Sequence, residues 1–184
     1  MAHLLPFRFS TALFFCVALL LSGCCANNVC DCEDAQADAI KLRFAPRFAA
    51  ADLDTIIIQR SPLPYNTTAK PETVTLIRTP ARARDSVVIN NSTPFTQAGS
   101  AKLNRYRYVV QYLAQQPKSK PVPTTVLVID STRLRGSLAG SGCCTCYTNT
   151  QKTVFATRPK RNSTALDSAF VIDLRQKSYI ELTK

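Results

Sequence analysis

Short runs of apolar residues, many of them alternating with polar residues, fill most of the chain after residue 39. The runs are rich in Val, Ile, Thr, Tyr and Phe, and prolines separate many of them, which is typical of β-strands. No stretch has a long helical period, although 45–53 and 96–103 allow a turn or two of helix. Eight to ten short strands predict an all-β fold, an antiparallel β-sandwich of the immunoglobulin-like or a related type. We expect strands at 40–44, 55–59, 73–77, 86–89, 105–113, 124–129, 132–138, 152–156, 169–174 and 179–182.

The longest of these runs, 105–113, begins with alternating arginines and tyrosines. Basic and aromatic residues interleaved in this way are also found in proteins that bind single-stranded nucleic acid. In a strand, however, successive side chains point to opposite faces. We therefore expect Tyr106, Tyr108 and Tyr112 to face the core and the arginines to face water.

Several polar or glycine-rich segments are predicted to connect strands. The glycine-rich stretch 136–142 lacks the ending of a phosphate-binding loop and is interpreted as a flexible connection. Asn149 and Thr150 are expected to turn a hairpin. Asp130 and Asp173 follow apolar runs, and although a carboxylate pair can act as acid and base, we interpret them as strand-end turn residues.

The N-terminal pattern differs from that of the rest of the chain. An apolar run of about thirteen residues, 9–21, follows Arg8; it is too short to span a membrane, which takes about 20 residues, and is typical of a secretory signal. Its end, Leu21-Ser22-Gly23-Cys24, resembles the lipobox of bacterial lipoproteins. The resemblance implies cleavage before Cys24 and a diacylglyceryl group on its sulfur; an ordinary cleaved signal is the alternative.

This resemblance sets the expected organisation of the chain. Residues 1–23 are the signal peptide, 24–38 a lipidated, cysteine-rich tether, and 39–184 the β-sandwich domain. Removal of the signal leaves 161 residues, enough for one domain with a core of its own.

Loss of the signal would also remove His3, the only histidine of the chain. Without histidine, Ser-His-Asp and Cys-His catalysis and the usual histidine-containing zinc sites are excluded. The sequence therefore predicts a protein that is not an enzyme and has no cofactor.

The chain has eight cysteines, of which Cys16 belongs to the signal and Cys24 to the lipid site. The remaining six form two clusters: Cys25, Cys30, Cys32 and Cys143, Cys144, Cys146. An even number in an exported chain indicates disulfides. Adjacent cysteines are too close to pair easily, whereas residues two apart in a strand share a face. We expect the clusters to pair with each other; a zinc or copper(I) site of Cys30, Cys32, Cys144 and Cys146 and free thiols are the alternatives.

The net charge of +11 favours anionic partners. The basic residues gather in loops and form a candidate patch of Arg78, Arg82, Arg84, Lys118, Lys120, Arg158, Lys160 and Arg161. Solvated loops without a partner are the alternative. An exported protein would meet acidic glycans, lipopolysaccharide or acidic envelope proteins; intracellular nucleic acid is not expected.

The lipobox, the cysteine-rich start and the late segment Cys143-Cys-Thr-Cys-Tyr-Thr-Asn-Thr-Gln-Lys152 together resemble cell-envelope lipoproteins of the Bacteroidota. This resemblance implies a membrane anchor through the N-terminal lipid and a place in the cell envelope, and no particular activity. An aspartate directly after the lipidated cysteine resembles a signal for retention in the inner membrane. Because Cys25 stands at that position here, the outer membrane is the expected location. The predicted role is non-enzymatic binding or assembly with an anionic partner, with a cysteine-based metal or redox protein as the alternative.

Overall fold

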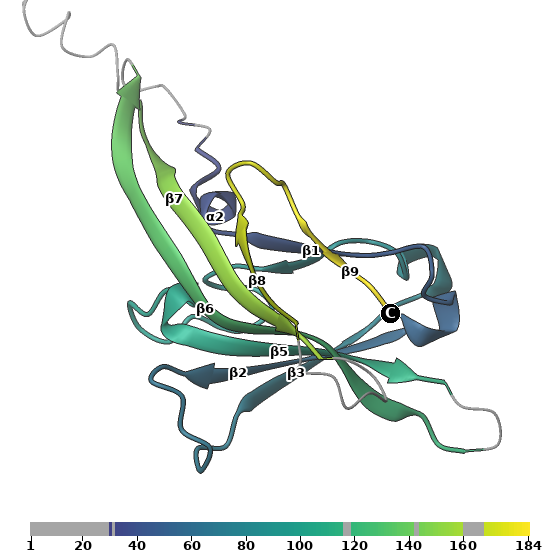
Figure 1. Ribbon diagram of the computed structural model, residues 1–184. Helices are drawn as coiled ribbons and strands as arrows, with labels where there is room; N and C mark the ends of the chain where they lie inside the picture. The colour runs from purple at the N-terminus through teal and green to yellow at the C-terminus, as the bar shows by residue number, and fades with distance from the viewer. Residues whose placement is uncertain (1–29, 31, 116–118, 142–143, 160–167) are drawn as a thin grey trace, which may run out of the picture.

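The structure is a computed structural model that describes residues 30, 32–115, 119–141, 144–159 and 168–184 (Figure 1). The described residues are all-β, as predicted: they form nine strands in two sheets. The six-stranded sheet has the order β3-β2-β5-β6-β7-β8 and the three-stranded sheet the order β4-β1-β9. The strands are β1 (Ile40–Phe44), β2 (Thr55–Pro62), β3 (Glu72–Ile77), β4 (Val87–Ile89), β5 (Tyr106–Ala114), β6 (Val122–Ser141), β7 (Cys144–Arg158), β8 (Ser168–Asp173) and β9 (Ile180–Leu182). One helical turn, α2 (Asp34–Ala37), precedes β1, and three 3₁₀ turns, η2 (Ala50–Asp52), η3 (Pro80–Arg82) and η4 (Leu103–Arg105), lie in the loops.

The smaller sheet is not purely antiparallel. All neighbours in the six-stranded sheet are antiparallel, but β9 pairs with β1 in parallel, with Leu42 opposite Ile180. This pairing joins two strands separated by almost the whole described chain, so no local sequence pattern indicates their relative direction.

The core lies between the two sheets and follows the expected alternation. Burial along β5 alternates without a break; Tyr106, Tyr108 and Tyr112 are buried, and Arg107 is only partly so. The opposing face comes largely from β1, in which Ile40 and Leu42 are completely buried. The prediction that the tyrosines face inward is therefore confirmed.

Arg60 and Asp52 are two of the three charged side chains that are buried among the described residues, and both have partners. The guanidinium of Arg60 lies 4.6 Å from the ring centres of both Phe95 and Tyr106 and forms an ion pair of 2.8 Å with Glu72. The contacts with the two rings and with Glu72 offset part of the cost of taking the charge out of water.

The second buried charge is Asp52, which accepts hydrogen bonds from Lys184 (2.7 Å) and from the backbone N–H of Gln115 (3.2 Å). Burial raises the pKa of Asp52, but these bonds and the charge of Lys184 outweigh it and leave the pKa below its usual value.

Strands β6 and β7 correct four sequence predictions. The runs 124–129 and 132–138 are one strand of 20 residues, with a register irregularity between Ile129 and Ser131. Asp130 therefore lies inside a strand and not at its end. Arg107 (3.3 Å) and Thr157 (2.7 Å) donate hydrogen bonds to its carboxylate. A bulge of this kind accommodates an extra residue without ending the pairing.

The other two corrections concern the far part of the same pair of strands. The stretch predicted as a flexible connection is paired β-strand from Gly136 to Ser141. Asn149 and Thr150 do not turn the chain; they lie inside β7, at a second register irregularity next to Gly136. Glycine and asparagine are poor strand formers, but pairing with a long partner strand overrides that preference.

The result is a long β6–β7 hairpin that extends beyond the rest of the sheet. Its neighbour β5 pairs with β6 only as far as Ile129, and β8 pairs with β7 only as far as Thr153. Beyond these points β6 and β7 pair only with each other among the described strands. Figure 1 shows this part of the hairpin rising away from the layers, with α2 beside β7.

Candidate functional site at the hairpin

Two disulfides join the N-terminal segment to the hairpin. Cys30 is bonded to Cys144 and Cys32 to Cys146, with Cα–Cα distances of 5.4 and 5.3 Å, and each bond bridges 114 positions of sequence. The residue number rises from 30 to 32 in the N-terminal segment and from 144 to 146 in its partner strand, so the segment runs parallel to β7. The prediction that the two clusters pair with each other is confirmed for these four residues. Cys24, Cys25 and Cys143 lie outside the described residues.

The pairing has consequences for the metal alternative. All four sulfurs proposed as metal ligands are consumed in disulfide bonds, and a thiol must be free and deprotonated to bind a metal. Within the described ranges, no three His, Cys, Asp or Glu residues gather as a metal site would require.

The disulfides also indicate the compartment. Bonds of this kind form and persist in oxidising surroundings outside the cytoplasm, so two of them indicate a non-cytoplasmic protein. In the part of the chain that the structure describes, no helix has the length and apolar character needed to cross a membrane.

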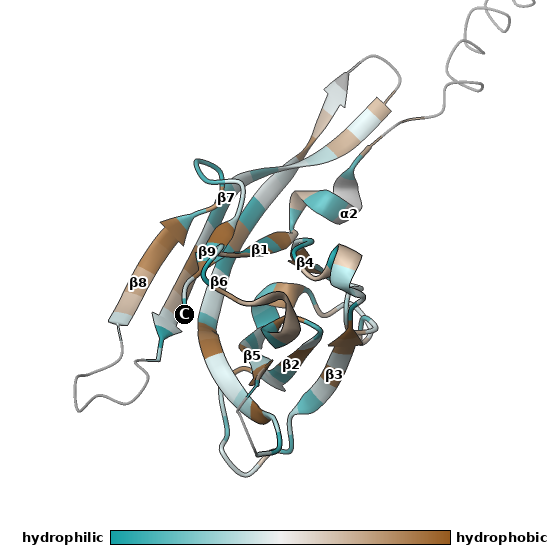
Figure 2. Cartoon of the chain, turned by 90° about the vertical axis from the view of Figure 1, so that its right-hand side faces the viewer, coloured by the Kyte–Doolittle hydropathy of each residue, from teal (hydrophilic) through white to brown (hydrophobic). Residues whose placement is uncertain are grey.

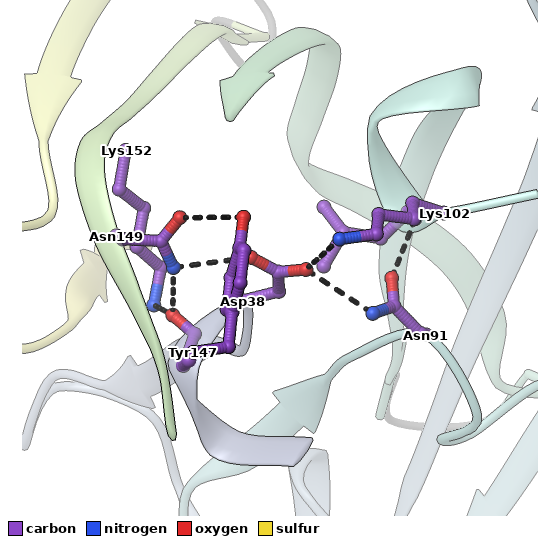
Figure 3. A network of polar contacts seen from close by, with 8 residues as sticks. Asp38, Asn91, Lys102, Tyr147, Asn149 and Lys152 are labelled. Atoms are coloured by element: carbon purple, nitrogen blue, oxygen red, sulfur yellow. Dashed lines mark hydrogen bonds and ion pairs between the residues drawn. The ribbon is translucent and has the colours of Figure 1, made fainter. Parts of the chain in front are cut away.

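After the disulfides and α2, the chain reaches a buried carboxylate, Asp38 (Figure 3). Only 2% of Asp38 is exposed. The amide of Asn149 on β7 donates to one oxygen (3.0 Å), and the amide of Asn91, after β4, donates to the other (3.2 Å). The ammonium of Lys102 lies 3.5 Å from the second oxygen. Asp38 thus connects the tether, the hairpin and the loop before β5; we call this group the Asp38 junction.

The residue before Asp38 extends the junction. The carbonyl of Ala37 accepts a hydrogen bond from the Asn149 amide and another, of 3.0 Å, from the ammonium of Lys152. Burial lowers the pKa of Lys152, and the charge of Asp38 opposes this effect. Two consecutive residues of the tether are therefore bound to β7 by side chains.

A hollow of about 390 Å³ opens beside the junction, lined by polar groups that include Gln97, Ser92 and Lys102. The Lys102 ammonium also lies 4.5 Å from the ring centre of Tyr147. Three donors surround Asp38, and they occupy most of the roughly four lone-pair sites of a carboxylate. A general base needs a free oxygen within reach of the substrate proton, so this arrangement favours a positioning role for Asp38 over catalysis.

The ring of Tyr147 packs across β6 at Gly136. A Cβ added at Gly136 would lie 2.4 Å from the Tyr147 ring and 2.6 Å from the backbone oxygen of Thr148. Glycine is required here because a backbone and an aromatic ring approach closely.

Gly136→Ala is therefore expected to destabilise the protein by about 1–3 kcal/mol, the usual cost of overpacking. Gly140→Ala is the matched control, because a Cβ there would meet nothing nearer than 3.9 Å. Urea unfolding of both variants measures the difference. Equal midpoints for the two variants would contradict the close packing of Tyr147 on Gly136.

Two of the predicted basic-patch residues hold loop backbone in place. Arg78 donates to the carbonyl oxygens of Ala83 (2.9 Å) and Asp85. Arg84 donates to the carbonyl of Phe48 (3.1 Å). These guanidinium groups are thus partly committed to structural hydrogen bonds around η3.

The remaining members of the predicted patch are distributed differently. Arg158, at the end of β7, stacks 4.4 Å from the ring centre of Phe170 and donates to the carbonyl of Glu181. Arg82 and Lys120 are exposed. Lys118, Lys160 and Arg161 lie outside the described residues. Arg82 is the last residue of η3, Lys120 precedes β6, and Arg158 is the last residue of β7.

Asp130 and Asp173, considered above as a carboxylate pair, have separate partners. Asp130 binds Arg107 and Thr157, while Asp173 ends β8 and accepts a hydrogen bond from the backbone N–H of Arg175 (2.9 Å). The turn-residue interpretation therefore fits Asp173.

Sequence reasoning missed a second group of arginines, on the hairpin itself. Arg133 and Arg135 line a strongly polar hollow of about 410 Å³ together with Asn104 and Gln151. The Arg133 guanidinium lies 4.8 Å from the ring centre of Phe155. The sequence did contain a signal for this group: the two arginines come just before residues 136–151, which contain no Asp, Glu, Lys or Arg.

Comparison of the chain with protein-family models, with curated proteins and with solved structures finds no match to any of them.

Proposed function

We propose that this chain is an exported, lipid-anchored protein of the cell envelope, with Cys24 as the lipidated residue and without enzymatic activity. The observation that supports it best is the disulfide-bonded tether: the segment that follows the lipobox is bonded to the sandwich at Cys30 and Cys32. A flexible linker would leave the domain free to move, whereas this arrangement holds it next to its point of attachment.

Chain length sets how close the domain stays to the membrane. Six residues lead from Cys24 to Cys30, and a fully extended chain covers at most about 3.6 Å per residue. The Cα atoms of Cys24 and Cys30 are therefore no more than about 22 Å apart. A lipid-bearing Cys24 with two or more acyl chains would hold the protein stably, since each buried methylene adds about 0.8 kcal/mol.

The proposed role at that surface is binding to an anionic partner. The charge of +11 supports attraction to acidic glycans, lipopolysaccharide or acidic envelope proteins. The paired sulfurs of Cys30, Cys32, Cys144 and Cys146 disfavour the alternative of a metal or redox protein. Because Cys25 follows Cys24, we propose the outer membrane as the address.

The test is expression of the full chain in a bacterium with lipoprotein processing, followed by mass spectrometry of the N-terminal peptide. The expected peptide begins at Cys24 and carries a diacylglyceryl group; Cys24→Ala, which leaves both described disulfides intact, should move the protein out of the membrane fraction. A free Cys24 thiol, or an intact 1–23 segment, would overturn the proposal.

A further inference from the structure

The far end of the β6–β7 hairpin differs in charge from the rest of the protein. The chain carries 35 Lys, Arg, Asp and Glu residues, yet residues 136–151 contain none. Within this stretch the structure describes Gly136–Ser141 and 144–151, and the side chain of Leu138 is 68% exposed. We call these described residues the neutral tip. Figure 2 shows the far end of the hairpin mainly in white and pale brown, with teal bands nearer the domain.

Three arginines surround the base of the neutral tip. Arg133 and Arg135 precede it on β6 and line the hollow of about 410 Å³. Arg175, after β8, donates to the carbonyl of Thr150 on β7. We call these three the basic collar. Asp173 accepts a hydrogen bond from the backbone N–H of Arg175 and adds one negative charge next to the collar. The three arginines and Asp173 together have a net charge of +2.

The hollow between Arg133 and Arg135 is suited to an anionic group. Its lining consists of these arginines with Asn104, Gln151, Leu134 and Thr132, and contains no carboxylate. Arginine donors match phosphate oxygens in geometry and charge. The hydroxyl of Thr132 is buried and has no hydrogen-bond partner in the structure.

The tether brings the membrane to this end of the molecule. The disulfides join Cys30 and Cys32 to Cys144 and Cys146, which belong to the neutral tip. The chain that leads back to Cys24 therefore starts at the far end of the hairpin. If Cys24 is lipidated, as the proposed function holds, its Cα atom lies within about 22 Å of the Cα atom of Cys30, which is disulfide-bonded to Cys144 of the neutral tip.

We propose that the neutral tip lies in the interface of an anionic lipid membrane, with Leu138 inserted at the headgroup boundary and the basic collar bound to lipid phosphates. Leu138 is three residues from Arg135, about 10 Å along the strand. That is comparable to the headgroup layer, about 5–8 Å on each side of the hydrocarbon. The hairpin stays in the interface, because its outer backbone groups need water.

The absence of tryptophan from the chain makes the proposal directly measurable. Leu138→Trp and Val122→Trp place a single fluorophore at opposite ends of β6, both at exposed positions (68% and 47%). The full chain is expressed, its lipidation checked by mass spectrometry, and the protein reconstituted in phosphatidylethanolamine–phosphatidylglycerol vesicles that contain brominated lipid. We expect a blue-shifted emission and at least twofold stronger quenching for Leu138→Trp than for Val122→Trp.

A second pair of variants tests the collar. Arg133→Glu with Arg135→Glu, added to Leu138→Trp, should reduce the quenching by at least half. Arg47→Glu with Lys70→Glu makes the same change in net charge at two exposed residues outside both the hairpin and the predicted basic patch, and should leave it unchanged. Vesicles of phosphatidylcholine alone should give weaker quenching than the anionic ones.

The outcomes separate this inference from the proposed function. A lipidated protein in which Leu138→Trp is quenched no more than Val122→Trp overturns the inference and leaves the anchor standing. Equal quenching on neutral and anionic vesicles, or equal effects of the two charge pairs, overturns the role of the collar. An unlipidated Cys24 overturns both proposals.

Discussion

Replacing all four cysteines of the two disulfides with alanine is expected to lower the free energy of unfolding by at least about 5 kcal/mol. Each bond spans 114 positions, and the two spans, 30–144 and 32–146, overlap almost completely. In the chain-entropy model, a bond that closes a loop of about 100 residues contributes about 4.7 kcal/mol by restricting the unfolded chain. A loss of this size is comparable to the whole stability of many domains.

The two bonds are not expected to contribute equally when removed in turn. With Cys32–Cys146 intact, the long loop is still closed, and Cys30→Ala with Cys144→Ala opens only a small ring. That double variant should cost less than about 3 kcal/mol, the contribution of a loop of about 15 residues. Either bond should therefore protect against loss of the other, a strongly non-additive result.

Urea unfolding of the wild type, the double variant and the quadruple variant measures these differences, and non-reducing peptide mapping confirms which bonds remain. The slope of the free energy of unfolding against urea concentration should become steeper when both bonds are absent, because the unfolded chain then exposes more surface. If the double variant lost as much stability as the quadruple variant, the two bonds could not be closing the same loop.

The parts of this fold that were predicted correctly depend on local geometry. Alternation with a period of two placed the tyrosines of β5 inward, and the rule that residues two apart share a strand face led to the pairing of Cys30 and Cys32 with Cys144 and Cys146. Both follow from the strand geometry of a few residues, which a single sequence contains.

The hairpin was predicted incorrectly because its strands are held by their partners. Gly136, Asn149 and Thr150 have low strand propensity or turn character, and two bulges interrupt the alternation at Ile129 and at Arg135. Local preference therefore predicted a connection at 136–142 and a turn at Asn149 and Thr150, where the described residues are paired strand. Strand propensity depends on context, and here long-range pairing determined the result.

The Asp38 junction was missed for a related reason. Asp38 stands in an acidic segment with Asp31, Glu33 and Asp34, which indicates a solvated tether. Its burial becomes visible only when Asn91 and Asn149, 53 and 111 positions away, are brought to it. For the basic loops the sequence suggested side chains available to a partner, but Arg78 and Arg84 donate hydrogen bonds to backbone oxygens.

Asp38→Ala is expected to cost about 3–4 kcal/mol. The substitution leaves the amide of Asn91 without its acceptor, leaves the amide of Asn149 with only the Ala37 carbonyl, and removes the counter-charge of Lys102. Each unsatisfied buried polar group costs about 1–3 kcal/mol. Asp85 is exposed, and Asp85→Ala makes the same change in net charge. This control should change the free energy of unfolding by less than about 0.5 kcal/mol.

The disulfides should make the Asp38→Ala penalty larger, not smaller. While both bonds are intact, the tether cannot move away from β7, so the unpaired groups stay buried and their full cost is measured. In the quadruple cysteine variant the tether can separate locally and let water reach Asn149, which limits the cost. Urea unfolding of Asp38→Ala in the two backgrounds, with amide hydrogen exchange of 147–152 as a local readout, tests this. An equal penalty in both backgrounds would mean that the junction stays closed without the disulfides, and that Asp38 alone is sufficient to fix the direction of the hairpin.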